Sequence, residues 1–127
     1  MSMDKPQPKT GITRLISAFH YSIKGFSACF KHEEAFRQEV ILFFVLLVVI
    51  VLIPVVPVIK LLLFSVNCLV LIVELLNSAV ETIVDKISPE YDELAGRAKD
   101  MGSGAVLLSL VVAAVVWAYA LYQIFFS

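Results

Sequence analysis

Three apolar stretches dominate this chain, and each is long enough to cross a lipid bilayer. They cover about residues 40–59, 61–85 and 104–126. A membrane-spanning helix needs roughly 20 mostly apolar residues, because its backbone polar groups must be bonded within the hydrocarbon region. Overall, 60% of the residues are hydrophobic and 17% are charged, which lies outside the range of soluble domains. The sequence therefore predicts an all-α membrane protein with three transmembrane helices and a single integral-membrane domain, residues 1–127.

The stretch before the first span, residues 10–38, has apolar residues at three- and four-residue steps. This apolar stripe consists of Ile12, Leu15, Ile16, Phe19, Ile23, Phe26 and Phe30. Such spacing predicts an amphipathic helix. Basic residues on the opposite side favour a position in the membrane interface, so we expect an N-terminal surface helix. For part of its length, packing against the protein core is an equally good interpretation.

Basic residues are unevenly distributed along the chain. Six precede the first span and three lie in the polar segment 86–103, whereas only Lys60 falls between the first two spans. Because Lys and Arg concentrate on cytoplasmic flanks, we expect a cytoplasmic N-terminus and a periplasmic C-terminus. The first residues, around Lys5 and Lys9, lack signal-peptide features and are expected to form a short disordered cytoplasmic tail.

The second span carries polar residues along one side. They follow each other at steps of three or four residues: Glu74, Asn77, Ser78, Glu81 and Asp85. A carboxylate inside a span costs roughly 2.5–3.5 kcal/mol, so this acidic face is a candidate functional site. Roughly fifteen apolar residues favour membrane insertion by about −0.4 kcal/mol each, and this only just offsets the cost of inserting two such carboxylates. We therefore expect this face to be buried against other helices and a cation, in an oligomer.

Other functional classes find little support. A net charge of −1 gives no field that would recruit nucleic acid. The sequence contains neither a phosphate-binding P-loop nor the motifs of soluble protein kinases. Cys29 and Cys68 are interpreted as small core residues, and His20 and His32 are too isolated to suggest a metal site.

Four segments carry a resemblance to a known family: YSIKG at 21–25, EAFRQE at 34–39, VELLNSAVE at 73–81 and GRAKDMGS at 96–103. In this order they resemble the bacterial integral-membrane diacylglycerol kinases of Gram-negative type. The resemblance implies a homotrimer of three-span chains in the inner membrane, each with an N-terminal surface helix. It also implies transfer of the γ-phosphate of MgATP to diacylglycerol, which gives phosphatidic acid.

The resemblance also implies roles for individual residues. Glu74 becomes the general base, a role that its depth in the membrane suits, and Asn77 becomes a second catalytic residue that can orient Glu74 or a phosphate oxygen. Glu33 and Glu81 become ligands of Mg²⁺, which prefers few protein oxygens plus phosphates. Counting back from the shared segment 34–39 favours Glu33 over its neighbour Glu34 as the metal ligand.

Further positions match residues that contact the nucleotide or the lipid in relatives. The nucleotide contacts are Arg14, Tyr21, Glu33, Glu81, Glu90, Tyr91, Asp92, Lys99 and Asp100, and the lipid contacts are Arg14, Ser22, Glu74 and Ser103. Asp92 replaces the histidine that is usual there. Lys99 is the expected phosphate contact, since it lies near the start of the third span. For Asp85, a role in the site and a surface ion pair with Lys86 or Arg97 are equally good interpretations.

Two other functions compete with this one. Acidic and amide groups inside a membrane would also suit a small proton or cation transporter. However, Ser65 and Asn67 are the only polar residues in the outer half of the second span, from 61 to 73, and a channel would need polarity through both leaflets. The closer alternative is a kinase for a polyprenol such as undecaprenol, which differs in the shape of the lipid pocket.

Overall fold

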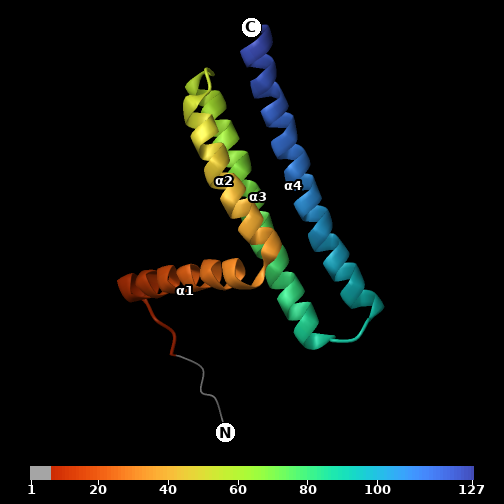
Figure 1. Ribbon diagram of the computed structural model, residues 1–127. Helices are drawn as coiled ribbons and strands as arrows, with labels where there is room; N and C mark the ends of the chain where they lie inside the picture. Colours follow the sequence, from red (N-terminus) through yellow and green to blue (C-terminus); the bar gives the residue numbers. More distant parts are fainter. Residues whose placement is uncertain (1–6) are drawn as a thin grey trace.

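The computed structural model describes residues 7–127, and the regular elements in this part of the chain are four helices (Figure 1). The helices are α1 (Gly11–His32), α2 (Glu34–Leu52), α3 (Pro57–Ile87) and α4 (Glu93–Phe126). The last three are long and apolar enough to cross a membrane, which confirms the prediction of three transmembrane helices. Residues 1–6, which include Lys5 and most of the expected disordered tail, lie outside the described residues.

α3 is the central helix of the bundle. α2 and α4 lie on either side of it, with the most extensive packing between α3 and α4, and α1 lies crosswise to them (Figure 1). Within residues 7–127 the backbone of α1 approaches α2 and α3, but it does not approach α4. The α3–α4 loop lies at one end of the bundle, and the α2–α3 turn and the C-terminus lie at the other.

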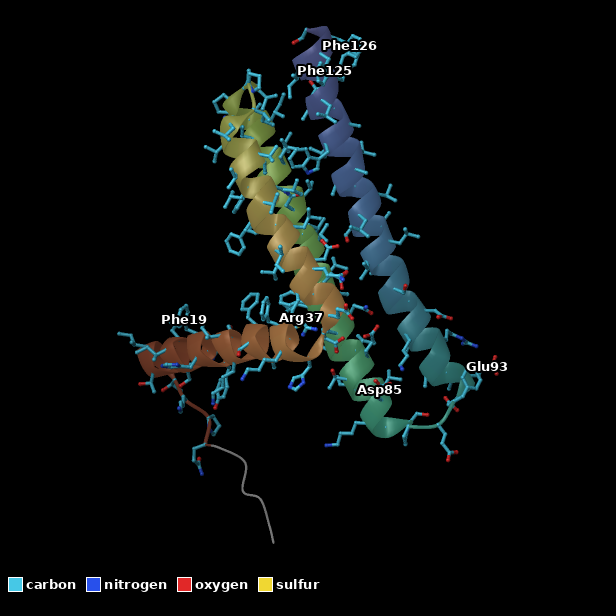
Figure 2. All side chains as sticks on the ribbon, in the orientation of Figure 1. Phe19, Arg37, Asp85, Glu93, Phe125 and Phe126 are labelled. Atoms are coloured by element: carbon cyan, nitrogen blue, oxygen red, sulfur yellow. The ribbon has the colours of Figure 1, made fainter. Side chains whose placement is uncertain are left out.

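The chain breaks between α1 and α2, so the helix predicted for residues 10–38 ends earlier than expected. Glu33 has extended backbone and separates the two helices. Arg37 then donates from Nη1 to the carbonyl oxygens of Phe30 and Lys31, at 2.9 Å each. These carbonyls belong to the last turn of α1, which has no helical partners for them. Residues 34–38 therefore start the first transmembrane helix, and Figure 2 shows Arg37 at this junction.

The two connections between the long helices also differ from the predicted boundaries. α2 ends at Leu52 instead of 59, because Pro54 excludes the helical conformation at the preceding residue. Lys60 closes this turn by donating from Nζ to the Val51 carbonyl oxygen at 2.8 Å. The predicted polar loop 86–103 is helical except at 88–92, since the Asp92 carboxylate accepts a hydrogen bond from the backbone N–H of Ala95 at 3.0 Å and caps α4.

The core lies along the interface of α3 with α4. Leu63 and Ala120 are completely buried there, and Val70 packs against Ala113. Most other apolar side chains of α2, α3 and α4 are exposed in the single chain, as expected for helices that face lipid or further protein. The apolar stripe of α1, including Phe19 near its start, is also exposed (Figure 2). Its location in a membrane interface stays a prediction.

Candidate functional site

The polar face of α3 points mostly into the protein. Glu74 and Ser78 are buried, Asn77 and Glu81 are half-buried, and Asp85, at the end of the helix, is exposed. The apolar residues between them are more exposed. A helix of this composition turns its polar side away from lipid, because an unpartnered carboxylate is costly in hydrocarbon. The structure therefore collects these polar side chains along the inward-facing side of α3.

Glu74 lies within electrostatic range of three further carboxylates. The charges of Glu39, Glu81 and Glu33 all act on the carboxyl group of Glu74. Glu74 and Glu81 come from α3, Glu39 from α2, and Glu33 from the break between α1 and α2. This group, Glu33, Glu39, Glu74 and Glu81, is called the carboxylate cluster below.

Glu39 is a member of this cluster that the sequence interpretation did not include among the site residues. It is half-buried in α2. Two signals were present in the sequence. Glu39 is the last residue of the segment 34–39 that carries the family resemblance. It also directly precedes an uninterrupted apolar run, where a carboxylate with only a surface role is unusual.

Asn77 lies between the cluster and α4. Its Nδ2 donates a hydrogen bond to Glu81 Oε1 at 3.3 Å, so it orients Glu81, and no such bond joins it to Glu74. Its Oδ1 is buried and has no hydrogen-bond partner within the described part of the chain. On the α4 side, this oxygen faces Gly102. Asn77 thus has one hydrogen bond to Glu81 of the carboxylate cluster and one contact with Gly102 of α4.

A cavity of about 540 Å³ opens between α1 and α3 beside the cluster. Glu33, Cys29 and Ser78 contribute to its walls. Burial raises the pKa of the Cys29 thiol, and the charges of Glu33 and Glu74 act in the same direction, against a hydrogen bond with Ser78. Cys29 is buried and unpaired, as its interpretation as a core residue requires, whereas Cys68 is only half-buried. The cavity gives a ligand access to the side of the cluster that contains Glu33.

A second group of predicted site residues surrounds the α3–α4 loop. Lys99 forms an ion pair with Asp85, which corrects the expected pairing of Asp85 with Lys86 or Arg97. Arg97 instead lies 3.7 Å from Glu93, one turn away on α4. A small cavity of about 120 Å³ at this loop is lined in part by Glu90, Tyr91, Asp92 and Lys99. Figure 2 shows Asp85 near the end of α3 and Glu93 at the start of α4.

The Asp92 side chain caps α4. This cap occupies one carboxylate oxygen of Asp92. Among the other residues assigned to the nucleotide and lipid, Asp100 and Ser103 are exposed on α4.

The predicted contacts on α1 are not brought to the α3–α4 loop within one chain. Arg14, Tyr21 and Ser22 are exposed. Ser22 donates to the carbonyl oxygen of Ala18 at 2.8 Å, and Lys24 Nζ lies 5.8 Å from the centre of the Tyr21 ring. Because α1 and α4 do not approach each other in residues 7–127, the predicted site is divided into separate groups in the single chain.

The carboxylate cluster fits the requirements of Mg²⁺ with a nucleotide. Residues 7–127 contain no group of three or more His, Cys, Asp or Glu side chains arranged to hold a metal ion by themselves. Mg²⁺ is usually bound by one or two carboxylates together with phosphate oxygens and water. Glu33 and Glu81, both half-buried, are a donor set of that kind.

Comparisons with known proteins bear on the function of the whole chain. The family model described as prokaryotic diacylglycerol kinase matches residues 20–121. A diacylglycerol kinase of Escherichia coli strain K12 is 47% identical over 116 residues, which cover 91% of this chain and 95% of that protein. A diacylglycerol kinase of Pseudomonas aeruginosa is 46% identical over 93% of this chain and 96% of its own length. One from Haemophilus influenzae is 42% identical over 89% and 96%, respectively.

Proposed function

Since this chain belongs to the prokaryotic diacylglycerol kinase family and is a kinase, we propose that it transfers the γ-phosphate of ATP to the free hydroxyl of diacylglycerol. The product is phosphatidic acid, formed at the cytoplasmic face of the inner membrane. The observation that carries this proposal is the position of Glu74, which is buried on a transmembrane helix and lies within electrostatic range of three further carboxylates.

The proposed chemistry depends mainly on positioning and charge. Phosphoryl transfer requires in-line alignment, neutralisation of the phosphate charge and a group that accepts the proton of the attacking alcohol. Glu74 accepts the hydroxyl proton of the lipid, and Lys99 contacts the phosphates. Glu33 and Glu81 hold Mg²⁺, which, when bound with ATP, offsets the negative charge of the phosphates. Asn77 fixes Glu81 through the Nδ2 hydrogen bond.

The remaining contacts are proposed to come from neighbouring chains in a homotrimer. Arg14 and Tyr21 of α1 do not reach Lys99 of the same chain, because α1 and α4 do not approach each other in the described residues. The apolar surface exposed by α2 and α4 supports the same assembly. In this arrangement a nucleotide contacts α1 of one protomer and α4 of another. The basic flanks place the N-terminus and the α3–α4 loop in the cytoplasm, and the C-terminus in the periplasm.

The test is phosphate transfer by the purified protein in mixed micelles. Radiolabelled γ-phosphate from MgATP should appear in diacylglycerol, and Glu74→Gln should lower kcat by about 10²- to 10⁴-fold, the usual contribution of a general base. Glu93→Gln is the matched control, because Glu93 is an exposed acid whose one ion pair among residues 7–127 is with Arg97 on its own helix. It should retain full activity.

Three outcomes would overturn the proposal. Phosphorylation of undecaprenol but not diacylglycerol would make the protein a polyprenol kinase. Proton flux in liposomes without any phosphorylated lipid would make it a transporter. An active Glu74→Gln variant would remove Glu74 from the reaction. Accessibility tags at the α3–α4 loop test the orientation, since reaction from the periplasmic side would contradict a cytoplasmic site.

A further inference from the structure

We infer that Gly102 of α4 is a positioning residue for the reaction, because it holds the amide of Asn77 in the orientation that contacts Glu81. The inference rests on the proposed function, and it concerns a residue that touches neither lipid nor nucleotide. It starts from a contact between α4 and the polar face of α3. There, the missing side chain of Gly102 is what makes room for Asn77.

The geometry distinguishes Gly102 from the other glycines of the helices. A Cβ atom at Gly102 would overlap Asn77 Oδ1 and would lie 3.2 Å from Asn77 Cγ. A Cβ atom at Gly104 or Gly25 would meet nothing within 4 Å. A glycine in the interior of a helix costs roughly 0.5–1 kcal/mol relative to alanine. At Gly102 this cost accompanies a close contact, whereas at Gly104 no such contact exists.

The hydrogen bond with Glu81 determines how the amide of Asn77 is oriented, and the space at Gly102 accommodates that orientation. Nδ2 donates to Glu81 Oε1, and Oδ1 points to Gly102. Turning the amide over would place Oδ1 against the Glu81 carboxylate, where two acceptors repel each other. Rotating the side chain away from Glu81 would break a hydrogen bond to a charged group, which is stronger than one between neutral groups. The observed orientation is therefore the one that Glu81 favours, and it needs the space left by Gly102.

A side chain at position 102 would disturb this arrangement directly. The Asn77 amide would have to leave its place, or α4 would have to move away from α3. In the first case Glu81 loses the donor that fixes its carboxylate four residues further along the same helix face. In the second case the bond within α3 is kept, and the packing of α4 against α3 is disturbed. Misplacement of a reacting group by about 1 Å can cost about 100-fold in rate. Gly102→Ala should thus act on the reaction through Asn77 and Glu81.

The chain contains only two asparagines, Asn67 and Asn77, which makes a spectroscopic test unusually direct. With ¹⁵N-labelled asparagine, the protein in micelles shows only two pairs of side-chain amide signals. Gly102→Ala should shift the Asn77 pair and leave the Asn67 pair in place, because Asn67 is bonded to Trp117. Gly104→Ala, the matched control, should shift neither pair. An unchanged Asn77 pair in Gly102→Ala would overturn the inference, as would an equal shift in both variants.

The kinetic test uses the same proteins. Gly102→Ala should lower kcat about 10- to 100-fold, whereas the KM for diacylglycerol should change little, since misalignment acts on the chemical step. Gly104→Ala should behave like the unmodified protein. If Gly102→Ala does not assemble, the double variant Asn77→Ala with Gly102→Ala should assemble again, because the smaller side chain removes the overlap. Failure of the double variant to assemble would also contradict the inference.

The outcomes separate this inference from the proposed function. If the unmodified protein phosphorylates no diacylglycerol, the proposed function fails, and the amide signals still report whether Gly102 positions Asn77. If the unmodified protein is active and Glu74→Gln is inactive, but Gly102→Ala has full activity, the proposed function stands and the inference about Gly102 fails.

Discussion

Substitutions of Trp117 and Asn67 should change the free energy of unfolding non-additively, because the two side chains share a hydrogen bond. Trp117 Nε1 donates to Asn67 Oδ1 at 3.0 Å and joins α4 to α3 across 50 positions of sequence. Asn67 is 7% exposed, and its Nδ2 has no partner in the described residues. The amide thus depends on a single bond within the membrane-spanning part of the bundle. Breaking this bond from either side leaves a buried polar group unpaired.

The magnitudes follow from which groups each substitution leaves unpaired. Trp117→Phe removes the donor and leaves the whole Asn67 amide unpaired, so it should cost about 1–3 kcal/mol of unfolding free energy. Asn67→Val leaves only the indole N–H unpaired, and it also removes the already unpaired Nδ2, so its cost should be about 1 kcal/mol or less. The double variant leaves neither group. It should cost less than the sum of the single variants by about 0.6–1.7 kcal/mol, as for interhelical hydrogen bonds in membranes.

Equilibrium unfolding in mixed micelles, at increasing mole fraction of SDS and followed by far-UV circular dichroism, measures these differences. Circular dichroism is required because Trp117 is the only tryptophan in the chain. Asn67→Val combined with Tyr119→Phe is the control pair, since Tyr119 is exposed on α4 and should not couple to Asn67. Additive costs within about 0.3–0.5 kcal/mol for Trp117 and Asn67 would refute the reasoning.

Three further predictions concern the loop and α1. Lys99→Met should lower kcat about 100-fold if Lys99 stabilises phosphate charge. Asp85→Asn, which removes only the exposed partner of Lys99, should leave thermal stability nearly unchanged. Steady-state kinetics and thermal melts of both variants check this, and equal losses of kcat would contradict the assignment of Lys99 to the phosphates. Asp92→Ala should cost about 1 kcal/mol of stability through loss of the α4 cap, measured by SDS unfolding, and a variant without loss would contradict the capping role. Alkylation of Cys29 at neutral pH should be much slower than that of a free thiol, because burial raises the pKa of the Cys29 thiol and leaves little reactive thiolate. Mass spectrometry after timed alkylation measures the rate. Rapid alkylation would contradict the buried position.

The helical architecture could be predicted because its causes are local. Apolar runs such as 104–126 favour membrane insertion residue by residue, and their length alone matches the bilayer. The inward orientation of the polar face of α3 also follows from the spacing of Glu74, Asn77 and Glu81.

The helix boundaries could not be predicted as well, because they depend on contacts between segments. Arg37 reaches back across the break at Glu33 to the last carbonyls of α1, and Asp92 caps a helix that was expected to begin only at 104. Such a cap is one hydrogen bond among several possible ones, and the sequence pattern does not show which one forms.

The candidate site, too, could be predicted from the sequence only in part. Glu33, Glu74 and Glu81 were predicted from motif and position. In the structure the charges of Glu33 and Glu81 act on Glu74, and the roles of the three residues in the reaction stay predictions. Glu39 was not recognised among the site residues. For Asp85, a role in the site and a surface ion pair with Lys86 or Arg97 were equally good interpretations, and the structure pairs it with Lys99. These partnerships join α2 to α3 and α3 to α4. They depend on how far each helix is rotated about its axis, and the hydrophobic pattern of the sequence determines this rotation only loosely.

By itself, the sequence determined that this chain forms three membrane-spanning helices and that one of them carries acids on a single face, since both properties are sums over neighbouring residues. The tertiary structure alone decided that Asn77 of α3 rests against Gly102 of α4, and that Asn67 of α3 bonds to Trp117 of α4. Those contacts join residues from two helices, so they depend on how α3 and α4 pack against each other and not on the spacing of residues along either helix.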